Sequence, residues 1–364
     1  MLNLYPVSNV PGSPNLFKSL PPQLQTSKNG VVRGDWQASS RDSVFGRYSI
    51  ARSSLLASSG LAEPAQSRAD RNIDSTSAGI GYTRTLSPTL INEFRFTWTT
   101  LNMHQDLTLP RDEIIPGSLD PRITSGIPSF NVSGFAGLGA QPGCCGNNPL
   151  QKTSGVWDWS DNISKSMGAH VLKFGGEFML IRPSTFAASN GRASFGFSGV
   201  FTQNPQGRSG TGSPVADLLM GNANSLTTGT IAEAIERGWF GSGYFQDQWT
   251  VSRQLTLNFG IRYEYSSPYI ETQNRMANFV LDPADPLFGQ LIQAGNANRP
   301  RALVDRDLNN WAPRVGFAWR SSKVKDLVVR GSFGIFYGQD QGTGVTNRMT
   351  SNPPSFGYGA QTIS

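Results

Sequence analysis

The sequence predicts an all-β fold: an antiparallel transmembrane β-barrel segment of about ten strands, with short periplasmic turns and long extracellular loops, incomplete as given. Between Leu255 and Tyr265 every odd-numbered residue is apolar or aromatic, and every even-numbered residue is polar or glycine. Such a strand presents one apolar and one polar face. The polar face carries Arg262 and Glu264, which indicates a wall that is apolar towards lipid and charged towards a lumen.

The same alternation recurs in five consecutive hairpins, which together supply the ten strands. Their strands are close to the ~9–11 residues that a tilted strand needs to cross a bilayer. Short polar turns join the strands of each hairpin, as at Ser87-Pro88-Thr89, where serine and proline favour a reversal of the chain. In chain order the residues that show the alternation in the paired strands fall within 32–38 and 44–50, 78–82 and 90–99, 157–163 and 172–178, 239–251 and 255–265, and 315–319 and 327–337.

The connections between hairpins are long and rich in glycine, proline, serine and asparagine. Compact soluble domains rarely contain several loops of this length, whereas outer-membrane barrels carry long loops on their outer side. The apolar run from Val215 to Met220 predicts one helical turn inside such a loop. The long connections are residues 53–75, 101–154, 182–236 and 266–311. We expect residues 1–30 to lead into the barrel as a loop segment, residues 31–338 to hold its strands and loops, and residues 339–364 to begin a further extracellular loop.

Composition and charge exclude several other classes of protein. The 364 residues contain no uninterrupted apolar run long enough to cross a bilayer as a helix, which excludes a helical membrane protein. The apolar residues form periodic segments, which argues against disorder. The net charge of +6 is dispersed, and many basic residues share a strand face with an acidic one, as Arg33 does with Asp35. A nucleic-acid surface would concentrate one sign of charge, so we expect no nucleic-acid partner.

The charged residues of the polar strand faces are the candidate functional residues. They are expected to face the lumen, where they hold neighbouring strands in register or line a solute path, and the sequence leaves both roles open. This lumen-facing charged set comprises Arg33, Asp35, Arg47, Glu93, Arg95, Lys173, Glu177, Arg262, Glu264 and Arg330.

Aromatic residues are expected to form a belt at each lipid–water interface. If the short turns are periplasmic, three tryptophans lie beside that edge, namely Trp36, Trp249 and Trp319. Four aromatic residues fall at the opposite, loop-bearing edge, namely Trp98, Trp157, Tyr265 and Tyr337.

Catalytic and metal-binding patterns are absent from the sequence. His104 and His170 are far apart and lack neighbouring ligands at metal-binding spacing, so both are read as surface histidines. Cys144 and Cys145 are adjacent, and a strained vicinal disulfide or no pairing at all both fit. Neither a Gly-x-Ser-x-Gly elbow nor a histidine-centred triad occurs. We therefore expect no enzyme activity, no cofactor and no metal.

Several strand segments resemble the barrel signature of TonB-dependent outer-membrane receptors. The resemblance is to the Oar-like branch, which carries a carboxypeptidase-regulatory-like domain at its N-terminus, and it covers most of the chain from about residue 30. The matching segments are residues 168–178, 216–221, 244–251, 255–264, 312–319 and 329–337, among them the run Tyr244-Phe245-Gln246-Asp247-Gln248-Trp249.

The resemblance implies a barrel of about twenty-two strands filled by an N-terminal plug. It also implies uptake of a scarce solute, such as a metal chelate, a glycan or a peptide, powered through the TonB protein. Because the sequence shows no plug, TonB-contact segment or signal peptide, we expect an internal barrel fragment in a Gram-negative type of cell outer membrane. Its expected partners are outer-membrane lipid, TonB through a plug absent from this chain, and an unknown solute. The alternatives are a passive porin or a structural or adhesive surface barrel, and a soluble all-β binding protein.

Overall fold

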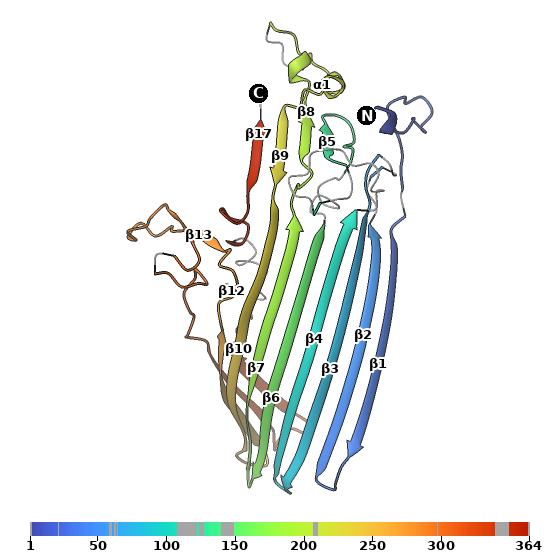
Figure 1. Cartoon of the computed structure of the whole chain (residues 1–364). Helices are drawn as coiled ribbons and strands as arrows, with labels where there is room; N and C mark the ends of the chain where they lie inside the picture. The colour runs from blue at the N-terminus through green and yellow to red at the C-terminus, as the bar shows by residue number, and fades with distance from the viewer. Residues whose placement is uncertain are drawn as a thin grey trace.

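The structure is a computed structural model that describes residues 2–20, 22–57, 60–61, 63, 65–107, 122–123, 127–139, 149–206, 210–296, 298–338 and 349–362. One long antiparallel sheet dominates it, and its strands lie side by side in chain order (Figure 1). The strands along the sheet are β1 (Leu24–Gln37), β2 (Asp42–Ala57), β3 (Ala69–Ser87), β4 (Leu90–Leu107), β6 (Leu150–Met167), β7 (His170–Ala188), β10 (Ile231–Thr250), β11 (Leu255–Ser266), β15 (Trp311–Arg320) and β16 (Val328–Gly334), and β12 (Ile270–Glu271) pairs with the upper part of β10.

All five predicted hairpins and their short turns are confirmed. The strands run further towards the loops than the alternation predicts: β10 has 20 residues, and β1 begins at Leu24, inside the segment predicted to be a loop. Outside the bilayer a strand needs no apolar face, although its backbone still pairs, as Leu24 does with Leu56. The apolar pattern therefore marks only the membrane-crossing part of each strand.

A second, smaller sheet lies at the loop-bearing end, opposite the short turns (Figure 1). Its core contains Phe130, Leu138, Phe197 and Leu218. The predicted helical turn is confirmed as α1 (Pro214–Met220), whose first turn is capped where the Ser213 hydroxyl accepts the N–H of Ala216 at 3.2 Å. The sheet consists of β17 (Tyr358–Thr362), β9 (Ser225–Gly229), β8 (Ser194–Phe197) and β5 (Ser129–Val132), in that spatial order.

Further short elements lie outside both sheets. The hairpin of β13 (Ala277–Phe279) and β14 (Leu291–Gln293) belongs to the connection between β11 and β15, and 3-10 turns occur at η1 (Leu2–Leu4) and η2 (Val200–Thr202). Among the described residues no helix is both long and apolar enough to cross a membrane.

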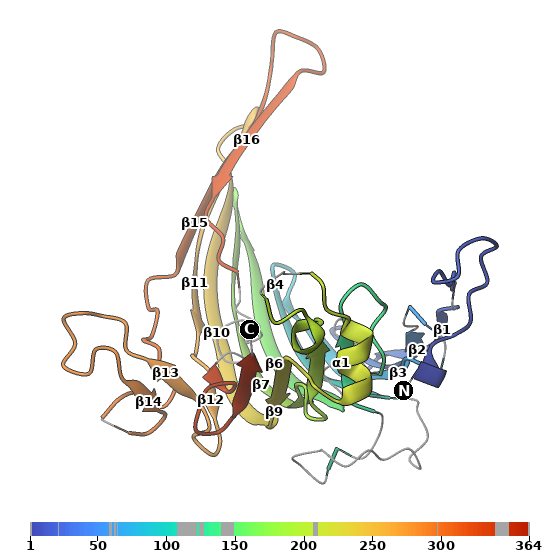
Figure 2. The same cartoon turned by 90° about the horizontal axis from the view of Figure 1, so that it is seen from above.

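Strand register assigns the side chains of the long sheet to two faces. Facing residues of antiparallel neighbours point to the same side, so the pairing of Phe259 with Val315, and of Val315 with Phe333, puts all three on one apolar face. On the other face lies a hollow of about 1090 Å³, lined from Lys173 on β7 to Ser332 on β16. The polar face is therefore concave. The sheet curves like a trough and is open between β1 and β16, as expected for an incomplete barrel (Figure 2).

Candidate functional site on the concave face

The concave face of the long sheet brings the charged residues of separate hairpins into rows. Glu264, Ser242, Glu177, Ser160 and Arg95 occupy successive facing positions across β11, β10, β7, β6 and β4. The same reading of the register puts the whole lumen-facing charged set, from Arg33 on β1 to Arg330 on β16, on this face.

The central cluster is formed by Arg262 and two glutamates. The Arg262 guanidinium donates from Nε to Glu264 Oε1 at 2.5 Å and from Nη2 to Glu177 Oε2 at 3.0 Å. Glu264 lies two residues along the same strand, whereas Glu177 comes from β7, two strands away. The side chains of Arg262, Glu177 and Glu264 are 23%, 29% and 15% exposed, so the cluster is half-buried and its charges are screened less than surface charges.

A polar contact beside this cluster depends on a glycine. Tyr244 faces Gly175, and Gly175 faces Asn162 on the next strand. The Tyr244 ring crosses over the glycine, and its hydroxyl donates to Asn162 Oδ1 at 2.7 Å. A Cβ on Gly175 would lie 2.4 Å from the Asp161 carbonyl oxygen and 3.0 Å from the Tyr244 ring. Glycine is therefore needed here, and it lets one tyrosine link three strands.

Other acid–base pairs lie within single strands, as the two-residue spacing predicts. Arg33 Nε donates to Asp35 Oδ2 at 2.9 Å, and Arg95 forms an ion pair with Glu93. Residues two apart on a strand share a face, which explains why such pairs are visible in the sequence.

The hollow itself has a basic lining. Lys173, Arg314 and Arg330 face it together with Gln246 and Asn258, and none of the described residues that line it is an aspartate or a glutamate. Arg330, a member of the lumen-facing charged set, has no hydrogen-bond or ion-pair partner among the described residues, and Ala318 occupies the facing position on β15. Lys173 shares its face with Glu177, yet the carboxylate of Glu177 pairs with Arg262 instead. Glu177 therefore pairs with the arginine two strands away and not with Lys173 on its own strand.

The aromatic residues lie on the convex face near both ends of the strands. At the short-turn end Trp249 faces Leu257, and Trp319 faces Leu255. Towards the loops, Trp98 faces Trp157 directly across β4 and β6. Trp36 faces Val44 and Tyr265 faces Gly241 on the same convex side, and Tyr337 lies beyond β16, where its hydroxyl donates to the carbonyl of Trp311 at 3.4 Å.

Two aromatic residues of the loop-bearing end are missing from the predicted belt. Trp239 packs on Tyr265 with ring centroids 4.8 Å apart, and Trp311 packs on Tyr263 at 4.7 Å. Trp239 begins its predicted strand, and Trp311 is the last residue of the predicted connection 266–311, so the alternation does not assign either of them to a face. Their facing partners, Leu180 for Trp239 and Tyr263 for Trp311, place them on the convex face.

His170 differs from its interpretation as a chance surface histidine. Its Nδ1 lies 2.7 Å from Asp247 Oδ2, and its ring stacks on Trp249 at 5.5 Å between centroids. Asp247 is 5% exposed on the convex face, and the other carboxylate oxygen has no hydrogen-bond partner in the described structure. The histidine thus pairs with a buried carboxylate near the short turns. The partner was missed because β7 and β10 are separated by a long connection.

The remaining chemical candidates provide no site. His104 lies in β4, not in a loop, and is exposed opposite Gln151. Cys144 and Cys145 lie outside the described residues. Within the described part of the chain, no group of three or more histidine, cysteine, aspartate or glutamate side chains is arranged to hold a metal ion.

Comparison with protein families assigns the chain. The family model of the outer membrane beta barrel domain matches residues 1–364. The chain belongs to this family. It is therefore a domain of the Gram-negative type of cell outer membrane, with its short turns periplasmic and its long loops extracellular. Comparison with curated protein sequences finds no match.

Solved structures with a similar fold include several outer-membrane transporters. The copper transporter OprC is 10% identical, with 86% of this chain and 37% of OprC covered and a TM-score of 0.45. The outer membrane transporter YddB from Escherichia coli is 10% identical, with 86% and 40% covered and a TM-score of 0.45. The ferric-catecholate import receptor Fiu from E. coli K12 is 10% identical, with 86% and 46% covered and a TM-score of 0.43. The chain spans less than half the length of each of these transporters.

Proposed function

We propose that the chain is the barrel portion of a TonB-dependent outer-membrane transporter that takes up a scarce solute, such as a metal chelate, a glycan or a peptide. One observation carries this proposal: the concave face is polar and charged from β1 to β16, yet it leaves a hollow of about 1090 Å³. A packed core would be apolar and closed. A polar, open interior is what a solute path requires.

The convex face argues against the soluble alternative. Phe259, Ile261 and Phe333 are 41%, 45% and 69% exposed, and no second sheet covers them in the described structure. Apolar surface of this extent is stable only against another apolar phase, which for an outer-membrane domain is the lipid.

The basic lining of the hollow supports a filled interior. Lys173, Arg314 and Arg330 face a common space without a carboxylate among its lining residues. Charges of one sign in a confined space favour an occupant of the opposite sign. An acidic surface on a plug would supply it, and TonB would then act on the barrel through that plug.

Energy dependence of uptake tests the proposal in cells. A strain lacking the gene is compared with wild type on iron-limited medium, on an oligosaccharide and on a peptide as sole carbon source. A transporter of this kind gives a growth defect on one of these media, and loss of TonB reproduces that defect. A defect that persists unchanged when the gene is supplied in a strain with TonB, or growth that is independent of TonB, would contradict the proposal.

A passive porin, or a structural or adhesive barrel, is the competing function. The purified protein is placed in liposomes, and swelling is followed in isotonic arabinose and then stachyose. A plugged transporter gives no swelling with either sugar, because its interior is filled. Rapid swelling with arabinose would favour the porin, and absence of both swelling and any TonB-dependent growth defect would favour the structural barrel.

A further inference from the structure

The convex face carries a second hollow, at the loop-bearing end of β7, β10 and β11. It measures about 1340 Å³, larger than the ~300–1,000 Å³ of ordinary small-molecule pockets. Its floor consists of strand residues that include Leu180, Trp239 and Tyr265, and its outer wall is formed by residues 300–308 of the connection between β11 and β15. This rim groove lies on the convex face, whereas the first hollow lies on the concave face.

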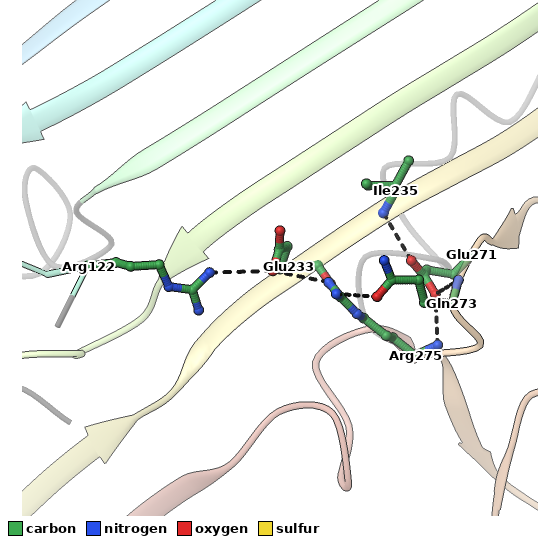
Figure 3. Close-up of polar contacts among 6 residues, drawn as sticks. All are labelled: Arg122, Glu233, Ile235, Glu271, Gln273 and Arg275. Atoms are coloured by element: carbon green, nitrogen blue, oxygen red, sulfur yellow. Dashed lines mark hydrogen bonds and ion pairs between the residues drawn. The ribbon is translucent and has the colours of Figure 1, made fainter. Parts of the chain in front are cut away.

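Residues 271–275, to which the wall of the rim groove is attached, are fixed to β10 by a buried carboxylate (Figure 3). Glu271 is 1% exposed, and its two oxygens accept the backbone N–H groups of Ile235 at 3.2 Å, Gln273 at 2.7 Å and Arg275 at 2.8 Å. Arg301 of the wall donates from Nη2 to the Glu271 carbonyl at 2.9 Å. The groove is therefore built by specific contacts and does not depend on a loosely placed loop.

Two exposed arginines face each other across the strands at the edge of the groove. Gly238 pairs with Ile181, so Arg237 on β10 occupies the position opposite Arg182 on β7. Like charges in facing positions destabilise a sheet. Neither guanidinium has a carboxylate within 4 Å among the described residues, and Arg182 instead lies over the Trp157 ring at 5.1 Å.

The acidic residues near the two arginines either form ion pairs with other arginines or are fewer than the arginines that line the groove. Glu233, above this pair, is shared by Arg275 at 3.2 Å and Arg122 at 3.5 Å (Figure 3). Arg306 and Asp305 of the wall also line the groove. The edge of the groove thus has more guanidinium groups than carboxylates, and it suits an anionic group.

Arg182 and Arg237 lie on the barrel at the level of the lipid headgroups. Arg182 lies twelve residues after His170, the first residue of β7. At ~3.4 Å per residue and a tilt of ~40°, Arg182 lies roughly 30 Å above the short turns, just beyond an apolar band ~25 Å tall. Below it, Trp239, Phe178 and Trp159 form a continuous aromatic row, with centroids 5.8 Å and 6.0 Å apart.

We propose that the rim groove binds a lipid of the outer leaflet through a phosphate on its headgroup. Arg182 and Arg237 hold the phosphate with charge-assisted hydrogen bonds, which relieves their mutual repulsion, and Arg306 closes the site from the wall. The acyl chains pack against the rings of Trp239, Phe178 and Trp159, which lie side by side across β10, β7 and β6. A lipid is favoured over a soluble anion because the groove continues directly into the membrane-facing surface.

The test uses the protein extracted from outer membranes and placed in phosphatidylcholine nanodiscs that contain diphosphorylated lipid A as the probe. Binding is compared for wild type, R182Q/R237Q and R182K/R237K. Loss of two charge-assisted bonds is expected to weaken binding at least tenfold in the glutamine variant. The lysine variant is expected to retain most of it, because it keeps both charges. Dephosphorylated lipid A is expected to bind wild type as weakly as the diphosphorylated form binds the glutamine variant.

Lys28 and Arg52 provide a matched control. They also face each other near the loop-bearing end of the convex face, on β1 and β2, but no groove wall covers them in the described part of the chain, and Asp74 lies 3.9 Å from Arg52. K28Q/R52Q is expected to bind the probe as wild type does. Equal binding by R182Q/R237Q, equal loss in K28Q/R52Q, or equal affinity for dephosphorylated lipid A would overturn the proposal. Competition by millimolar inorganic phosphate would overturn the choice of a lipid and assign the groove to a soluble anion.

Discussion

Arginines occupy two regions of this barrel domain and are balanced differently in each. In the central cluster of the concave face, Arg262 is held between Glu177 and Glu264. At the convex rim, Arg182 and Arg237 face each other with no carboxylate in reach among the described residues. The same side chain is thus neutralised inside the fold in one region and left for an external anion in the other. Position relative to lipid, more than residue type, decides what a charge does here.

The largest change in the free energy of unfolding is expected when an arginine is placed on the lipid-facing surface, away from both the central cluster and the rim groove. Phe259 points to the lipid near the middle of β11, and its neighbour Asn258 points into the concave hollow. Phe259→Arg should lower the free energy of unfolding by about 2–4 kcal/mol, because a guanidinium near the membrane midplane loses its hydration. Urea unfolding in lipid vesicles, followed by tryptophan fluorescence, measures the change.

Asn258→Arg is the matched control for this substitution. It adds the same charge one residue away but on the aqueous side, so its effect should stay within about 1 kcal/mol. Equal destabilisation by the two variants would mean that the convex face does not contact lipid, and the contrast between the two faces would fail.

The next largest change in the free energy of unfolding is expected in the central cluster. Arg262→Ala leaves Glu177 and Glu264 close together and half-buried, so we expect a loss of about 2 kcal/mol, below the ~3–5 kcal/mol of a fully buried pair. The triple variant E177Q/R262M/E264Q removes the charges together and should recover most of this loss. If the triple variant is as unstable as Arg262→Ala, packing around the arginine accounts for the effect and its charge does not.

Only some of these charge contacts can be predicted from the sequence alone. The hairpins and the same-strand pairs follow from a two-residue period, so Glu264 is an evident partner of Arg262. Glu177 and Asp247 contact their partners across the boundary between β7 and β10, which a long connection separates in the chain. Register across such a connection is set by pairing and not by a turn, so sequence spacing does not reveal it. The facing position of Arg182 and Arg237 was missed for the same reason.

A smaller, pH-dependent effect is expected in the loop that carries β13 and β14. The backbone N–H of Leu287 and then the Arg299 guanidinium lower the pKa of Asp285. Because the folded-state pKa is depressed, the stabilisation is present above the ordinary aspartate pKa and is lost as the pH falls through the folded value. The protection factor of the Leu287 amide, which is its intrinsic exchange rate divided by the observed rate at the same pH, should therefore fall at acidic pH in wild type. In Asp285→Asn the protection factor should be low already at neutral pH, and an unchanged protection factor there would exclude this contact as the cause.

The smallest effect is expected where an arginine pair is open to water. Arg33 and Asp35 are 50% and 62% exposed on β1, although their geometry is as good as that of the central cluster. Solvent screens such a pair, and holding two long side chains in one geometry opposes the attraction. Arg33→Gln should leave the urea midpoint unchanged within error, at low salt and at 0.5 M salt alike. A clear loss of stability would mean that β1 pairs with another strand in the membrane and that Arg33 is buried there. The difference in exposure between Arg33 and Arg262 would then exist only while the sheet is open at β1.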